Sequence, residues 1–580
     1  MKFHQLAQAL LALEKESSRI KMTELLAALL KEATPQEAQI ISYLTLGTLR
    51  APYKANTFNF AEKSMLKLLA PFVGQTPAEF SSSVRQSGDI GGALLSAQWT
   101  EPHHELTVSE VYAQLEKLQE LSGTGSQEDK ATLLASLLQQ VDVLSALFIV
   151  RMVLGTMRLG FSDMTLIDAL SWMATGNKSL KKSLEHAYNL CADSGYIAFL
   201  LKEGGPEALA SVHPTIGIPI RLAAADRGES AQAIIDKIGP CYAQPKLDGF
   251  RLQIHIDTKQ DKIWFFSRNL HDMSTMFPDL EKPLKSLNVD TLIVEGEAIV
   301  YDEETQSFLP FQETVKRKRK HNIEEVAQTL PLRLFLFDIL YVNGNSVLDK
   351  PHTERRALLL KYCGASSNQK IQVIQEHYCS SASELAAYFS EQITQGLEGL
   401  VVKRPDAAYQ PGKRNSNWIK LKRHEEGHLR DTIDAVILGY YAGMGKRASF
   451  QIGAFLVGLY NSEKDRFETL AKVGTGLKDE EWIELKKICD AHPSPEMPPN
   501  VVCAPELAPD VWTVPTTVVV ILADEITQSP LHSAGKTKDN LGFALRFPRF
   551  MGYAVDKTAT QATSVDEIKK LYKIQYSSGS

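Results

Sequence analysis

The chain has 580 residues, of which 44% are hydrophobic and 23% charged, an ordinary balance for a globular protein. At roughly 100–200 residues per domain, this length predicts about three or four domains. The formal net charge of -6 gives no overall attraction to nucleic acid, and no apolar run is long enough to span a membrane. None of the six cysteines forms a CxxC pair, which argues against a zinc site or a disulfide framework and favours a reducing cytoplasm.

Residues 1–212 are predicted to form a helical domain. Thr34 and Thr107 each begin a capping box, because a glutamate follows three residues later at the start of an apolar run. We expect a flexible connector at Gly123–Lys130 and then a helix from Ala131 to Leu147.

Residues 213–430 are predicted to form an α+β domain, because strand-like runs dominate there and helical runs separate some of them. The strand-like runs are "KIWFFSRN", "TLIVEGEAIVYD", "RLFLFDILYVNG", "GLVVKRP" and "NWIKLKR". Residues 431–580 contain the shorter runs "DAVILGYYAG", "IGAFLVGLYN" and "TTVVVILADEI", with turn signals between them. This spacing favours a small β-barrel.

The strands of the middle domain carry charged residues where their apolar neighbours predict burial. These residues are Lys246, Asp248, Arg251, Arg268, Glu295, Glu297, Glu398, Lys403, Lys420 and Lys422. Charges in such places are normally paired or lie at an edge, so this set predicts a polar cleft lined by strand ends. Lysines and arginines in a cleft suit a polyphosphate, and carboxylates among them suit Mg²⁺. The pattern favours phosphoryl or nucleotidyl transfer.

Lys246 lies in the stretch "AQPKLDGFRLQIH" (Ala243–His255) and is the candidate nucleophile. A free lysine has a pKa near ~10.4, so only about one in a thousand is neutral at pH 7. Partial burial and neighbouring cations lower such a pKa and free the amine. From the residues alone, an ordinary lysine at a strand end remains the alternative.

Seven short segments follow one another along the middle and C-terminal parts of the chain. They are "KLDGFR" (246–251), "SRN" (267–269), "VEGEAIVYD" (294–302), "FDILYVNG" (337–344), "EGLVVKRP" (398–405), "WIKLKR" (418–423) and "LRFPRF" (545–550). Together they resemble the motifs of covalent nucleotidyltransferases, and specifically those of ATP-dependent DNA ligases. Val150–Leu170 resembles the DNA-binding domain of the archaeal and eukaryotic replicative type. The resemblance covers most of the chain and implies an all-α DNA-binding domain, an α+β adenylation domain and a C-terminal OB-fold barrel.

This resemblance implies an enzyme that seals nicks in duplex DNA with ATP and Mg²⁺, Mn²⁺ being an alternative metal. Lys246 would attack the α-phosphorus of ATP to give lysyl-AMP, the AMP would move to the 5′-phosphate of the nick, and the 3′-hydroxyl would displace it. The resemblance also implies a monomer, a sliding clamp as a candidate partner, and, for a prokaryotic source, a cytoplasmic location at the nucleoid.

The resemblance assigns roles to further residues. ATP is expected to contact Gln244, Arg251, Arg268, Glu297, Phe337, Lys420, Lys422 and Arg549, with the Phe337 ring on adenine and the two lysines on the α-phosphate. Arg251 and Arg268 are also candidates for the phosphate of the nick. Glu297 and Glu398 are expected to bind the metal. DNA is expected to contact Arg151, Arg158, Gly160, Lys316, Arg317 and Lys472.

Two positions depart from the family pattern. Gln244 stands where an acidic residue is usual, and Ala554 stands where the family has an arginine that orients pyrophosphate. Arg546, Arg549 and Lys557 are the nearest candidates to replace that arginine.

Three alternatives remain open at this point. An RNA ligase or a GTP-dependent capping enzyme shares the lysine motif but normally lacks the helical N-terminal domain. An NAD-dependent ligase usually has a four-cysteine zinc site, for which this chain has no CxxC pair. A non-catalytic DNA clamp derived from a ligase is favoured only by Ala554.

Overall fold

The structure is a computed structural model. It describes all residues except 96–98, 100–104, 124, 303–306, 310–313, 315–316, 318–326, 328, 365–368, 396, 423–431, 556 and 578–580. Contacts divide the chain into two units, Met1–Met65 with Thr100–Arg423 and Leu66–Trp99 with His424–Ser580. The predicted boundary between residues 212 and 213 therefore falls inside the first unit. None of the described helices combines the length and apolarity that crossing a bilayer requires.

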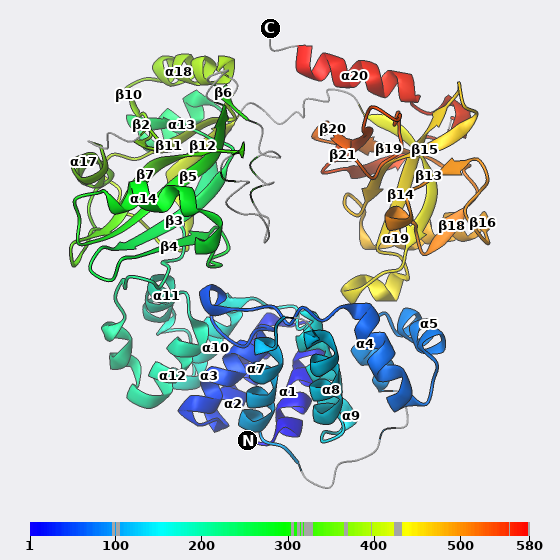
Figure 1. The fold of residues 1–580 in the computed structure, drawn as a ribbon, viewed down its shortest axis with the longest axis horizontal. Coiled ribbons are helices and arrows are strands. Elements are labelled where there is room, and N and C mark those ends of the chain that lie inside the picture. Colours follow the sequence, from blue (N-terminus) through cyan, green and yellow to red (C-terminus); the bar gives the residue numbers. More distant parts are fainter. Residues whose placement is uncertain are drawn as a thin grey trace. The chain divides into compact units, whose positions relative to one another are not determined.

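Helices make up the start of the first unit (Figure 1). They are α1 (Phe3–Lys15), α2 (Arg19–Glu32), α3 (Pro35–Thr45), α7 (Val108–Glu120), α8 (Ser126–Leu138), α9 (Val143–Leu154), α10 (Asp163–Thr175), α11 (Lys181–Cys191) and α12 (Ser194–Gly204). Both predicted capping boxes are confirmed, at Thr34 with Glu37 and at Thr107 with Glu110.

The predicted helix over Ala131–Leu147 is wrong, because the chain forms two helices there. The first, α8, begins already at Ser126, inside the expected flexible connector. The second, α9, begins after Asp142, whose side chain accepts hydrogen bonds from the backbone N–H groups of Leu144 and Ser145. A short polar side chain that caps a helix in this way starts a new helix within an apolar run.

Two sheets form the rest of the first unit. The five-stranded sheet has the order β1 (Ala224–Arg227), β12 (Arg414–Lys422), β11 (Gly399–Lys403), β2 (Cys241–Pro245), β10 (His377–Cys379). The seven-stranded sheet has the order β4 (Lys262–Ser267), β3 (Phe250–Asp257), β5 (Thr291–Asp302), β7 (Leu332–Val342), β8 (Asn345–Ser346), with β6 (Ser307–Phe308) on β5 and β9 (Ile371–Val373) on β7. All five predicted strand runs of this region form strands.

Each sheet buries one face under helices. Apolar side chains of the five-stranded sheet form a core with residues of α13 (Ala231–Ile238) and α18 (Ala382–Thr394). Those of the seven-stranded sheet pack with α14 (Pro278–Lys285) and α17 (His352–Cys363). Since side chains alternate along a strand, the polar residues of both sheets point away from these cores.

The second unit contains an eight-stranded sheet and a hairpin. The sheet has the path β16 (Pro493–Ser494), β18 (Val511–Thr513), β13 (Ile433–Tyr441), β14 (Ala454–Asn461), β15 (Arg466–Val473), β17 (Val501–Val502), with β19 (Val518–Leu522) between β13 and β22 (Arg549–Tyr553). The hairpin joins β20 (Glu525–Ser529) to β21 (Gly542–Arg546), and α19 (Asp479–Asp490) and α20 (Val565–Ser577) pack against the apolar core. The helices α5 (Pro77–Ser87) and α6 (Ile90–Leu94), although early in the sequence, belong to this unit.

Candidate active site

Lys246 directly follows the last residue of β2, which lies between β11 and β10 in the five-stranded sheet. Its backbone N–H donates to the carbonyl of Gly399 at 2.9 Å, which extends the pairing of β2 with β11. Its Nζ forms an ion pair with one oxygen of Glu398, and Nζ of Lys422 lies 3.4 Å from the other oxygen. The structure thus brings together the candidate nucleophile, a candidate metal ligand and a candidate phosphate contact.

Glu398 binds both cations as a carboxylate. Burial raises its pKa, but the charges and hydrogen bonds of Lys246 and Lys422 outweigh burial, so the pKa lies below its ordinary value. The side chains of Lys246 and Glu398 are 23% and 27% exposed, which leaves the pair within reach of a ligand. The amine must leave Glu398 and lose a proton before it can attack phosphorus.

Glu297 faces this cluster from β5 of the seven-stranded sheet. The N–H of Gly249 donates to its Oε1 at 3.1 Å. A Cβ at position 249 would lie 2.4 Å from the carbonyl oxygen of Ala298, so glycine is required for this close approach. Burial raises the pKa of Glu297 to about 7, although Lys246 and Arg251 pull it down. A carboxylate whose charged form is disfavoured by burial fits a cation, and Glu297 and Glu398 are the residues that would hold Mg²⁺.

Arg251 projects from β3 on the same face as Glu297, its register partner on β5. One guanidinium nitrogen lies 3.0 Å from Oε2 of Glu295, and the guanidinium carbon lies 5.5 and 5.4 Å from the ring centres of Phe337 and Trp418. Glu295 is fully buried and serves to position Arg251, because its other oxygen accepts from the Tyr409 hydroxyl at 2.9 Å.

Phe337 and Trp418 meet edge to face, with ring centres 6.0 Å apart, so they join the two sheets. Nζ of Lys403 lies 4.4 Å from the Trp418 ring centre and donates to the Phe337 carbonyl at 2.8 Å. A cation against aromatic faces is stabilised by their negative charge. The Phe337 ring thus lies next to Trp418 and to the cations of Lys403 and Arg251.

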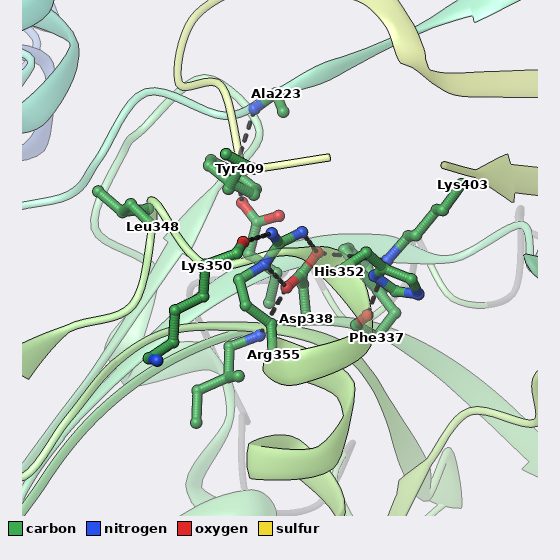
Figure 2. A network of polar contacts seen from close by, with 12 residues as sticks. Ala223, Phe337, Asp338, Leu348, Lys350, His352, Arg355, Lys403 and Tyr409 are labelled. Atoms are coloured by element: carbon green, nitrogen blue, oxygen red, sulfur yellow. Dashed lines mark hydrogen bonds and ion pairs between the residues drawn. The ribbon is translucent and has the colours of Figure 1, made fainter. Parts of the chain in front are cut away.

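A buried charge network supports Phe337 from behind (Figure 2). Nε of Arg355 donates to Oδ1 of Asp338 at 2.8 Å, and Nη2 of Arg355 donates to Oδ2 at 3.1 Å. Nζ of Lys403 lies 3.4 Å from the same Oδ2. Burial raises the pKa of Asp338, but Arg355 and Lys403 hold it far below its usual range. Figure 2 shows Arg355 between Asp338 and the backbone carbonyl of Lys350. Asp338 lies in the quoted motif "FDILYVNG" but was given no role of its own, and Arg355 was not among the predicted site residues.

The remaining ATP-binding candidates have varied surroundings. Gln244 is buried and donates to Glu376 at 2.6 Å. Lys420 is half-buried on β12, opposite Val401. Arg268 is exposed just after β4, and among the described residues its side chain has no hydrogen bond or ion pair.

Two arginines expected to contact DNA are instead buried. Arg151 on α9 is 4% exposed and binds both carboxylate oxygens of Glu14, at 2.7 and 3.0 Å. Arg317 is 2% exposed and pairs with Asp279. Since both guanidinium groups are held inside the protein, we expect them to stabilise the fold and not to contact phosphate. Lys316 lies outside the described residues.

Other DNA-binding candidates are better placed. The loop between α9 and α10 has Arg158 and Gly160 in the left-handed region, with φ of 62° and 71°. Arg158 is half-buried, and Gly160 is exposed. Lys472 is exposed on β15, with its Nζ 3.7 Å from the ring centre of Tyr441.

Ala554 is buried among apolar residues of the second unit and donates its N–H to the Val518 carbonyl. The candidates to replace an arginine there are all paired. Arg549 pairs with Asp524, Arg546 lies 3.3 Å from Glu525, and Lys557 pairs with Asp434.

Comparisons with known proteins agree along the whole chain. Residues 2–171 match the family model of the DNA ligase N terminus, residues 222–422 that of the ATP dependent DNA ligase domain, and residues 448–557 that of the ATP dependent DNA ligase C terminal region. The "Probable DNA ligase" of Dictyoglomus turgidum is 43% identical over 577 residues, 99% of this chain and 98% of that protein. "DNA ligase 2" of Thermofilum pendens is 38% identical over 581 residues, 97% of this chain and 96% of that protein.

A solved structure described as "Pmar-Lig_Pre." shares the fold, with a TM-score of 0.56, 18% identity, and coverage of 95% of this chain and 99% of that chain. The architecture is thus that of a three-domain ligase, with a nucleotidyltransferase core and a C-terminal sheet domain. The chain belongs to the family of ATP-dependent DNA ligases.

Proposed function

We propose that the protein seals nicks in duplex DNA through a lysyl-AMP intermediate on Lys246. The observation that carries the proposal is the cluster of Lys246, Glu398 and Lys422, whose Lys246 lies close enough to Glu297 to pull the pKa of that carboxylate down. The family match supports ATP as the nucleotide and DNA as the acceptor.

In the first step, Nζ of Lys246 forms a bond to the α-phosphorus of ATP and pyrophosphate leaves. The proton that the amine must lose has a nearby acceptor in Glu398. Lys422, once released from Glu398, supplies positive charge to the α-phosphate. Glu297 and Glu398 fit Mg²⁺, which would neutralise charge on the phosphates when bound.

In the second step, a 5′-phosphate oxygen of the nick attacks the AMP phosphorus and the Lys246 amine leaves. In the third step, the 3′-hydroxyl attacks the activated 5′-phosphate and AMP leaves. Arg268 is exposed beside the cleft strands and suits the 5′-phosphate, while Arg251 is fixed by Glu295 and suits the ribose or the same phosphate.

DNA contacts outside the cleft are assigned to Arg158, Gly160 and Lys472. An arginine at positive φ is uncommon, and such strain concentrates at functional loops. We also propose that the strands of the second unit form the OB-fold barrel of the family. A sliding-clamp partner and a monomeric state stay predictions from the family resemblance.

The test uses purified protein with α-labelled ATP and Mg²⁺, followed by nicked duplex DNA. We expect label on the protein, transfer to DNA and a sealed strand. Lys246→Arg keeps the charge but removes the usable amine, and the label should fall by more than about 10⁴-fold. Label that persists on this variant would overturn the assignment of Lys246.

A second arm offers nicked DNA that already carries the 5′-AMP. This substrate needs only the last step, so sealing without prior labelling of the protein would locate a defect in the first step, where Ala554 departs from the family. No sealing in either arm would favour a non-catalytic DNA clamp.

A further inference from the structure

The side chain of Gln244 is held by the buried carboxylate of Glu376, which lies in the segment between the two sheets. Gln244 lies on β2, two residues before Lys246, and is 2% exposed. Its Nε2 donates to Oε2 of Glu376 at 2.6 Å. Glu376 lies in the short segment that joins β9 of the seven-stranded sheet to β10 of the five-stranded sheet.

Glu376 is surrounded by donors. Its Oε2 also accepts from Nε2 of His352 at 2.8 Å, and Nε of Arg356 lies 3.6 Å from Oε1. Burial raises the pKa of Glu376, but His352, Lys403 and Arg356 outweigh it and the pKa stays below its ordinary value. The group is therefore an ionised carboxylate, which can only accept hydrogen bonds.

This fixes which end of the Gln244 amide faces which way. The NH₂ group must face Glu376, because a carbonyl oxygen there would meet a second acceptor. Oε1 then points away from Glu376, and among the described residues it accepts no hydrogen bond. Cys241 and Ala243 face the apolar core, so alternation puts Gln244 on the cleft side of β2, the side of Lys246.

We propose that Glu376 sets the nucleobase preference of the first step by holding Gln244 so that it offers an acceptor to the 6-position of the base. The inference rests on the proposed function, since it concerns the nucleotide that Lys246 attacks. Adenine has an amino donor at this position, whereas guanine and hypoxanthine have a carbonyl. The carbonyl of a 6-oxo base would face Oε1 of Gln244, and two acceptors cannot form a hydrogen bond. This disfavours the 6-oxo bases by about tenfold to a hundredfold. Glu376 and His352 are positioning residues in this scheme.

Glu376→Gln removes the constraint, because a glutamine can donate to Gln244 as well as accept from it. Gln244 is then free to turn its amide over and offer NH₂ to a 6-carbonyl. We compare ATP with inosine triphosphate, which has the 6-carbonyl of guanine without its 2-amino group. The ratio of kcat/KM for lysyl-nucleotide formation, ATP over inosine triphosphate, should fall about tenfold or more.

The exchange of the two residues is the sharper test. Gln244→Glu alone places two buried carboxylates together and should abolish labelling with ATP. Q244E combined with E376Q restores one donor facing one acceptor, with a carboxylate oxygen again toward the base. Labelling by ATP and its preference over inosine triphosphate should both return to within about threefold of the parent protein. The exchanged pair keeps the test usable even where E376Q alone fails to fold.

Glu295→Gln is the matched control, because it neutralises another fully buried carboxylate of the cleft that does not touch Gln244. It should lower labelling with both nucleotides and leave their ratio unchanged. An unchanged ratio in E376Q, or an exchanged pair no better than Q244E, would overturn the proposal. Absence of any label on the parent protein would instead remove the proposed function on which it rests.

Discussion

The two charge clusters of the cleft differ in burial, and with it in what their charges can do. In the first, the side chains of Lys246, Glu398 and Lys422 are 23–29% exposed. In the second, those of Asp338, Arg355 and Lys403 are all 1% exposed. A pair with access to water contributes about 0–1 kcal/mol and can separate, whereas breaking a buried pair leaves an uncompensated charge. The first cluster is therefore suited to take part in a reaction, and the second is a permanent support.

The largest effect is expected from breaking the permanent cluster. Asp338→Asn removes the charge that compensates Arg355 and Lys403, and should lower the free energy of unfolding of the first unit by about 3–5 kcal/mol. Urea unfolding of the purified protein measures this loss. Glu398→Gln is the matched change in the partly exposed cluster and should cost less than about 1 kcal/mol. Equal losses for the two variants would contradict the distinction between the clusters.

The same distinction applies to the arginines of the helical region. Arg151 is bound by Glu14 inside the protein, while Arg158 lies in a strained loop. Arg151→Gln should lower the free energy of unfolding by about 1–3 kcal/mol and leave the salt dependence of DNA binding unchanged. Arg158→Gln should cost less than about 1 kcal/mol and reduce the slope of log affinity against log salt by about one.

Titrations of nicked DNA at several salt concentrations decide between the two arginines. A reduced slope in R151Q together with full stability would restore the original expectation that Arg151 contacts phosphate. A slope unchanged in R158Q would remove Arg158 from the DNA surface. Lys472→Gln offers an independent comparison in the second unit, since its side chain is exposed.

Local patterns predicted the strands of the cleft well. The run "TLIVEGEAIVYD" coincides with β5, Thr291–Asp302, because an apolar alternation over one strand is a local property. Alternation along the strands likewise predicts which charged residues share a face, as Arg251 of β3 and Glu297 of β5 do. The need for glycine at position 249 does not follow locally, because the carbonyl that it approaches belongs to Ala298 on β5.

What the sequence could not show is what each charge meets in the fold. Glu14 lies 137 residues from Arg151, and Glu376 lies 132 residues from Gln244. Periodicity tells which side of an element a residue occupies but not which distant segment covers it. A buried arginine and a DNA-binding arginine therefore look alike in sequence, and the motif that contains Asp338 did not show that its partner is Arg355.

A further expected effect concerns Glu297, the carboxylate for which burial outweighs the pull of Lys246 and Arg251. Its pKa in the folded protein is about 7, above the ordinary value of 4.5. Because this pKa is raised in the folded state, Glu297 stabilises the folded protein at pH values below 4.5, where it is protonated. This contribution is lost as the pH rises through about 7. Glu297→Gln does not ionise, so it should be more stable than the parent by about 1–2 kcal/mol at pH 8 and equal to it near pH 4.5.

Unfolding at a series of pH values measures this difference, and a difference that does not vary with pH would refute the assigned cause.

Mg²⁺ sharpens the comparison with the permanent cluster. A cation bound by the ionised Glu297 offsets the cost of its burial, so Mg²⁺ should stabilise the parent protein at pH 8 more than E297Q. It should leave the loss in D338N unchanged, because Asp338 already has its charge partners inside the protein. The two measurements would then separate the stability that Mg²⁺ supplies at Glu297 from the stability that the buried ion pairs of Asp338 supply without a ligand.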